Sequence, residues 1–144
     1  MSIRVPRRRV ESVAFELDGE PVTVFSAEGI ALDGPQTRDV YYDLLSPIFV
    51  DQPDWGEPVS SPLVVGGLSN VFEATSQVML TDDDGLPLGE ATVTATCGTG
   101  CWGEWETKFE YSIDREQFGA LIVWAESAED GSRVHVREYS IQLR

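Results

Sequence analysis

The chain has 144 residues, 42% of them hydrophobic, and 25 acidic against 10 basic residues give it a formal net charge of −15. This length suits one ordinary domain, or one domain with an appendage, and it is long enough to bury a core. No run approaches 18 consecutive apolar residues, so we expect no direct membrane insertion. A surface this acidic repels nucleic-acid phosphates, and we expect no nucleic-acid partner.

Four of the ten basic residues lie before the first acid, at Arg4, Arg7, Arg8 and Arg9. A twin-arginine export signal needs an apolar run after the arginines, but Glu11 and Ser12 follow here instead. A targeting or tethering tail is the functional interpretation. A solvated terminus is the simpler one, and we favour it.

Residues 1–46 predict a small α+β appendage made of one hairpin and one short helix. The hairpin covers residues 10–25, with Asp18-Gly19 in its turn, since this pair tolerates the positive φ of a tight turn. The helix covers residues 36–45, with Thr37 as its cap and with one apolar stripe along its length. Pro47 ends it, because the residue before a proline is pushed out of the helical region.

From residue 48 onward, short apolar or alternating runs follow one another with turn signals between them and no helical periodicity. The runs lie at 48–50, 63–65, 72–81, 91–97, 105–113, 120–127 and 134–143. This pattern is typical of an antiparallel β-sandwich of immunoglobulin type. The predicted fold class is therefore all-β, an immunoglobulin-like sandwich of about seven strands over residues 47–144.

Two of these runs carry further information. Trp105 and Phe109 alternate with charged residues, which places Trp105 in the core. In the last run, Val134 and Val136 fall on one phase, whereas Tyr139 and the apolar residues after it fall on the other. A phase change within a strand predicts a bulge or a switch of sheet.

Cys97 and Cys101 enclose Gly-Thr-Gly, a spacing that can close a small disulfide-clamped turn. A redox pair is unusual at this spacing, and half of a zinc site would leave His135 as the only other soft donor. We therefore favour a structural disulfide. Such a bond would place the chain in an oxidising compartment outside the cytoplasm.

Carboxylates are the remaining candidates for chemistry. Asp82, Asp83 and Asp84 could suggest calcium, but they are contiguous and precede Gly85, so a solvated turn is the better interpretation. A glycosidase pair could be sought among Glu104, Glu106, Glu110, Glu126, Glu129 and Asp130. Alternating acids on a strand lie on its outer face, whereas a general acid needs burial. We expect no catalytic residue, no metal and no cofactor, and hence no enzyme.

Tryptophans in loops can stack on sugars or anchor a partner. Trp102 follows the second cysteine directly, and Trp55 lies in a link rich in proline and glycine. We expect both to be exposed.

Several segments resemble a known family. They are VSSP at 59–62, NVFEAT at 70–75, TATCGTGCWG at 94–103 and ESAEDGSR at 126–133. Together they resemble the immunoglobulin-like domain of bacterial spore germination, over about residues 48–144. The resemblance implies a β-sandwich at the bacterial cell envelope with no catalytic residues to carry over.

The segment before it is similar to the C-terminal end of a GerMN domain, a sporulation and germination module. The similar stretches are DGEPVTVF at 18–25, LDGP at 32–35 and DLLSP at 43–47. In the family this module often precedes the immunoglobulin-like domain in envelope lipoproteins. From these residues alone we expect neither a signal peptide nor a lipobox cysteine.

These observations favour a non-catalytic, extracytoplasmic scaffold that binds envelope proteins. The candidate contact surface comprises Phe72 and Glu73, Trp102 beside the cysteine turn, and Trp55. A cell-wall glycan-binding module that uses Trp55 and Trp102 is the alternative. Exposed strand edges would also permit an oligomer.

Overall fold

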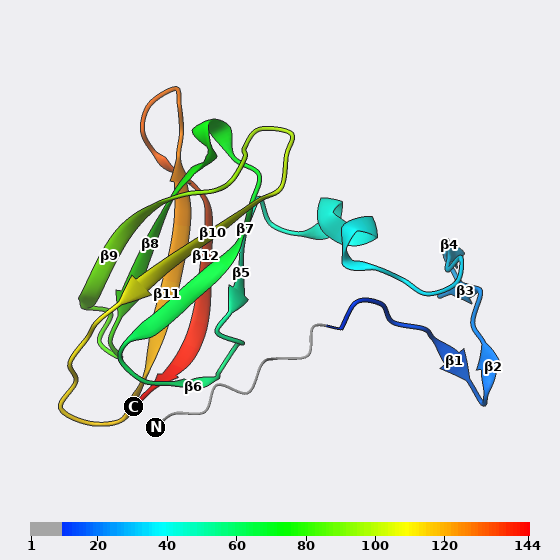
Figure 1. Cartoon of the computed structure of the whole chain (residues 1–144), viewed down its shortest axis with the longest axis horizontal. Helices are drawn as coiled ribbons and strands as arrows, with labels where there is room; N and C mark the ends of the chain where they lie inside the picture. Colours follow the sequence, from blue (N-terminus) through cyan, green and yellow to red (C-terminus); the bar gives the residue numbers. More distant parts are fainter. Residues whose placement is uncertain (1–9) are drawn as a thin grey trace. The chain divides into compact units, whose positions relative to one another are not determined.

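The computed structural model describes residues 10–144, which divide after Leu44 into two compact units (Figure 1). The arginine cluster at residues 4–9 lies outside the described residues. The first unit contains two short hairpins and one short helix. Its elements are β1 (Glu16–Leu17), β2 (Glu20–Pro21), β3 (Val24–Phe25), β4 (Ile30–Ala31) and the 3₁₀ helix η1 (Arg38–Leu44).

Asp18 and Gly19 form the turn between β1 and β2 with φ of 50° and 82°, as the sequence predicts. A second hairpin, β3–β4, was not predicted. It turns through Ser26 and Gly29, whose φ values are 66° and 74°. The predicted helix is present only as 3₁₀ turns, and none of its residues is buried. A short helix without a buried face lacks the packing that stabilises most helices in proteins.

The second unit, Leu45–Arg144, is a sandwich of two sheets (Figure 1). The smaller sheet has the order β10 (Gly103–Phe109), β7 (Leu63–Ser69), β5 (Ile48–Gln52). The larger has the order β6 (Pro58–Val59), β12 (Arg133–Leu143), β11 (Gln117–Glu126), β8 (Thr75–Thr81), β9 (Pro87–Thr94). Pairing is antiparallel except between β12 and β6. The predicted all-β, immunoglobulin-like sandwich is confirmed.

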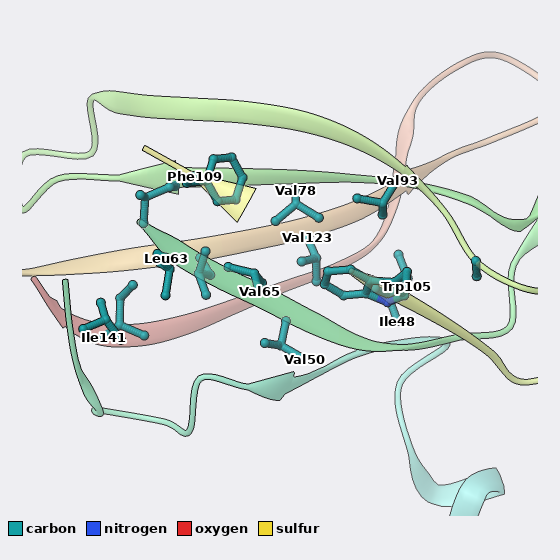
Figure 2. Packing of buried hydrophobic residues seen from close by; sticks show 14 of the residues in the cluster. Ile48, Val50, Leu63, Val65, Val78, Val93, Trp105, Phe109, Val123 and Ile141 are labelled. Carbon is teal, nitrogen blue, oxygen red and sulfur yellow. The ribbon is translucent and has the colours of Figure 1, made fainter. Parts of the chain in front are cut away.

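The core lies between the two sheets, where alternate side chains from both inner faces meet (Figure 2). Val65 on the smaller sheet and Val78 and Val123 on the larger are fully buried. Trp105 is only 4% exposed, which confirms its predicted place in the core. Gly67 is required beside it, because a Cβ there would overlap the Phe49 carbonyl oxygen of the neighbouring strand.

The phase change in the last strand is a β-bulge. Val123 pairs with Arg137 and Ala125 with Val134, so His135 and Val136 both lie opposite the single residue Trp124. His135 has φ of 57°, the left-handed conformation that bulges use. The bulge reverses the phase of β12, so Ile141 and Leu143 reach the core while Val136 is exposed.

One strand assignment from the sequence is wrong. The alternation from Phe72 to Leu80 predicts one continuous strand, but β8 begins at Thr75. The preceding segment, η2 (Phe72–Ala74), is a tight turn in which Glu73 and Ala74 have φ of 56° and 57°. Left-handed backbone interrupts the strand there, so Phe72 points outward and is 61% exposed.

Candidate functional site

Three connections meet at one end of the sandwich (Figure 1). They are the η2 turn between β7 and β8, the disulfide loop between β9 and β10, and the loop between β11 and β12. We call residues 70–74, 97–101 and 126–132 together the tip. The candidate contact residues Phe72 and Glu73 belong to it, and Trp102 follows it directly in sequence.

The cysteine pair forms the predicted disulfide, with 5.8 Å between the Cα atoms of Cys97 and Cys101. The loop that it closes is bonded to the segment before η2. The Thr99 amide donates to the Val71 carbonyl at 3.0 Å, and the Gly100 amide donates to Oδ1 of Asn70 at 2.7 Å. The disulfide loop therefore fixes the position of the η2 turn.

The η2 turn holds a strained backbone. Left-handed φ costs an L-residue roughly 1–2 kcal/mol, and Glu73 and Ala74 both adopt it. The Ala95 amide donates to the Ala74 carbonyl at 2.8 Å and ties the end of the turn to the strand opposite. Gly98 packs so closely under the turn that a Cβ would overlap the Val71 carbonyl oxygen. Strain held by its surroundings in this way is typical of functional segments.

A hollow of about 180 Å³ opens beside the turn. Side chains of the turn, of β8, of the end of β11 and of the following loop line it. They are Phe72, Glu73, Thr75, Gln77, Glu126, Ser127 and Ala128. Both glutamates are exposed, and neither has an ion-pair partner among residues 10–144.

The loop between β11 and β12 is closed by its own hydrogen bonds. The Ser127 amide donates to the Ser132 carbonyl at 2.8 Å. The hydroxyl and the amide of Ser132 donate to Oδ1 of Asp130 at 2.7 and 3.0 Å. These bonds favour the charged carboxylate and lower the pKa of Asp130 below its ordinary value. The Arg133 guanidinium lies 3.9 Å from the centre of the Trp124 ring, a cation–π contact.

The predicted contact tryptophans differ in exposure. Trp102 was expected to be exposed, but it is half-buried and interacts with other groups of the protein. Trp55 is 69% exposed and lies outside the tip, between β5 and β6. Its ring meets Tyr139 edge-on at 5.9 Å between centroids, and the Gly56 amide donates to the Ser140 carbonyl at 2.7 Å. Trp55 is therefore an exposed aromatic residue, in contact with Tyr139 and separate from the tip.

The acidic turn at residues 82–84 is organised by hydrogen bonds within the protein. Oδ1 of Asp82 accepts from the amides of Asp84 and Leu86 at 3.0 and 2.8 Å. Asp83 pairs with Arg115 at 2.6 Å, and this bond raises the pKa of the guanidinium above its ordinary value. The three carboxylates lie close together but are mostly exposed, which supports the interpretation as a solvated turn.

The other carboxylates considered for hydrolysis are all exposed. They are Glu104, Glu106, Glu110, Glu126, Glu129 and Asp130. None of them has the burial that a general acid requires. His135 is exposed in the β-bulge, and both cysteines are committed to the disulfide, so they offer no thiolate to zinc.

Sequence reasoning did not find the residues that support the η2 turn or line the hollow beside it. Asn70 is bonded to a residue 30 positions away, and Gln77 and Glu126 come from different strands. Side chains so far apart in sequence carry no shared local pattern. Only the pairing of β8 with β11 brings the two sides of the hollow together.

Comparison with known proteins identifies the sandwich. The model of the immunoglobulin-like domain of bacterial spore germination matches residues 47–132. The chain belongs to this family. The match covers most of the sandwich and begins after the first unit.

Among solved structures, CopC from Methylosinus trichosporium OB3b is similar at 16% identity, with 67% of this chain and 92% of that chain covered and a TM-score of 0.42. No curated protein matches. Within residues 10–144, no helix is both long and apolar enough to cross a membrane.

Proposed function

We propose that this member of the family is a non-catalytic, extracytoplasmic domain that binds other proteins at the bacterial cell envelope through its tip. The observation that carries the proposal is the disulfide-braced η2 turn, which presents Phe72 at 61% exposure on a strained backbone. Aromatic side chains on pre-organised loops are frequent anchors of protein interfaces, because little freedom is lost on binding.

The disulfide also supports the proposed location. Disulfides persist in oxidising compartments and are rare in the cytoplasm. Residues 1–46 resemble the end of a GerMN domain, and we propose that they connect the sandwich to such a module. Pairing through exposed edge strands, such as β9 or β5, is a further proposal for an oligomer.

Capture of envelope proteins by the full oxidised chain tests this function. We expect a discrete protein to be retained, and we expect Phe72→Ala to remove it. Phe118→Ala is the matched control, because Phe118 is also 61% exposed but lies outside the tip. Equal capture by the two variants would refute a contact through the tip.

A cell-wall glycan module is the second candidate, and Trp55 is the observation that favours it. An exposed indole held by a neighbouring ring can stack on the apolar face of a sugar. Incubation with purified sacculi should then sediment the wild type, but not Trp55→Ala. If both remain in the supernatant, glycan binding is excluded.

A further inference from the structure

We propose that the hollow at the tip receives the cationic side chain of a lysine or arginine, presented by a basic segment of the partner protein. This inference rests on the proposed function and names the chemistry of the partner. It is carried by one small concavity whose lining combines an exposed aromatic side chain, polar side chains and two carboxylates without an ion-pair partner among residues 10–144.

The charged side chains that line the hollow, among residues 10–144, are both acidic. Glu73 lies on the turn and Glu126 at the end of β11, and both side chains border the same space. The adjoining loop adds Glu129 and Asp130, and no lysine or arginine of residues 10–144 lines the hollow. Arg133 lies directly opposite Glu126 in the pairing of β11 with β12, but it forms no ion pair with Glu126, and its guanidinium lies over the Trp124 ring instead. A cation entering here meets carboxylates that have no partner in the described chain.

An exposed ion pair alone contributes at most about 1 kcal/mol, so the carboxylates do not define a site by themselves. Phe72 supplies the second contact. Its ring face attracts a cation, and its carbon surface packs against the methylene stem of a lysine or arginine. Because the disulfide loop holds the segment before the η2 turn, the backbone that carries Phe72 is already positioned beside the hollow before a side chain enters.

The polar lining and the size of the hollow also favour a single side chain. Oε1 of Gln77 accepts a hydrogen bond from the Thr92 hydroxyl at 2.8 Å, which orients the Gln77 amide. The volume of about 180 Å³ lies below the roughly 300–1,000 Å³ of sites for drug-sized ligands. One extended side chain from a partner fits this space better than a free metabolite does.

A divalent cation is the competing occupant. Calcium takes 6–8 oxygen ligands, whereas this hollow offers two carboxylates on different elements. Within the described residues, the acids close enough together to hold a metal are Asp82, Asp83 and Asp84, which do not line the hollow. The chemistry at the tip therefore fits an organic cation.

The test is a titration of the ¹⁵N-labelled, oxidised full chain with the peptide acetyl-Gly-Arg-Gly-amide, followed by amide chemical shifts. We expect saturable shifts at the tip and on the facing ends of β8 and β11. The citrulline analogue, which has the same shape without the charge, should produce none. Raising the salt concentration should weaken the binding, because the pair is exposed.

Two variants of matched charge locate the site. Glu73→Gln with Glu126→Gln should weaken peptide binding about tenfold or more, since each exposed pair is worth up to about fivefold. Glu90→Gln with Glu106→Gln removes the same charge from exposed positions outside the hollow and should leave affinity within about twofold. Phe72→Leu, which keeps apolar surface but loses the ring, should weaken binding about twofold to fivefold.

Three results of the titration would overturn the inference. The first is an absence of saturable shifts, and the second is an equal loss of affinity in both glutamine pairs, which would mean general attraction to an acidic surface. The third is saturation of the tip by calcium chloride without a response to the peptide.

If Phe72→Ala abolishes partner capture while Glu73→Gln with Glu126→Gln retains it, the inference fails but the proposed function stands. If the peptide binds at the tip but partner capture does not depend on Phe72, the proposed function fails instead.

Discussion

The two units of this chain use their apolar residues in opposite ways. In residues 10–44, Leu32 is the one buried hydrophobic residue, and the strands are two residues long. Of the fourteen exposed large hydrophobic side chains among residues 10–144, nine lie there, namely Val10, Val13, Phe15, Leu17, Val24, Phe25, Ile30, Val40 and Leu44. In Leu45–Arg144 the apolar residues instead form one cluster between two sheets. Residues 10–44 thus form a compact unit without a hydrophobic core. Within residues 10–144, the sandwich supplies nearly all of the apolar burial that stabilises a fold.

The same substitution in each unit makes the sharpest test of this contrast. Phe109 in the sandwich is 5% exposed, whereas Phe15 in the first unit is 43% exposed. Phe109→Ala should lower the free energy of unfolding by about 3–5 kcal/mol, because it leaves a cavity. Phe15→Ala should cost less than about 1 kcal/mol. Chemical denaturation followed by tryptophan fluorescence would measure both, and equal losses would show that the two units unfold together.

Removal of the disulfide should have the next largest effect. Cys97→Ser with Cys101→Ser should reduce stability by about 2 kcal/mol, from the loop-length relation. It should also reduce partner capture, because the loop then holds the η2 turn less firmly. Reduction of the wild type with dithiothreitol should reproduce both changes. Unaltered capture after reduction would show that the brace is not needed for contact.

The third prediction concerns the contribution of the Tyr111 hydroxyl to the stability of the sandwich. The Tyr111 hydroxyl donates to the Val59 carbonyl at 3.0 Å, and burial raises the pKa of Tyr111 above its ordinary value. Tyr111→Phe should cost about 1 kcal/mol, measured by denaturation. Since the folded-state pKa is the higher one, this contribution is present below the unfolded-state pKa near 10 and is lost as pH rises through the folded-state value. A Phe variant with unchanged stability and unchanged alkaline behaviour would contradict this role.

The smallest expected effect is at Asp130 in the tip. Its lowered pKa means that its stabilisation is present above the unfolded-state pKa and is lost as pH falls through the folded-state value. Carboxyl NMR should show a titration midpoint below the usual value for aspartate, about 3.9. Ser132→Ala removes the hydroxyl donor and should raise that midpoint. An unchanged midpoint in Ser132→Ala would mean that the serine hydroxyl does not hold the loop.

The sandwich was predictable because its signals are local and repeat along each strand. Strict alternation placed Trp105 in the core, and the change of phase after Val136 predicted a bulge or a switch of sheet, of which the structure shows the bulge. Asp18-Gly19 predicted its hairpin for a similar reason, since turn geometry depends on neighbouring residues. The helix was predicted from its apolar stripe. It forms only as 3₁₀ turns, because that stripe has no buried surface to pack against.

The tip was predictable only in part. The cysteine spacing indicated the disulfide. The alternation from Phe72 onward predicted a strand that starts there, whereas β8 begins only at Thr75. Glu73 and Ala74 adopt left-handed φ without a glycine or asparagine to signal it. The disulfide loop, which lies far away in sequence, is hydrogen-bonded to Asn70 and Val71 just before these two residues. The hollow likewise exists only once β8 and β11 pair, and no single segment encodes it.

Amide hydrogen exchange on the intact, oxidised chain tests the central contrast most directly. We expect slow exchange along β7, β8, β11 and β12, where amides open only with the whole sandwich. Amides of residues 10–44 should exchange at the earliest time points, because their two-residue strands have almost no buried apolar contacts. Comparable protection in both units would contradict the account, since it would show that residues 10–44 share in a cooperative core.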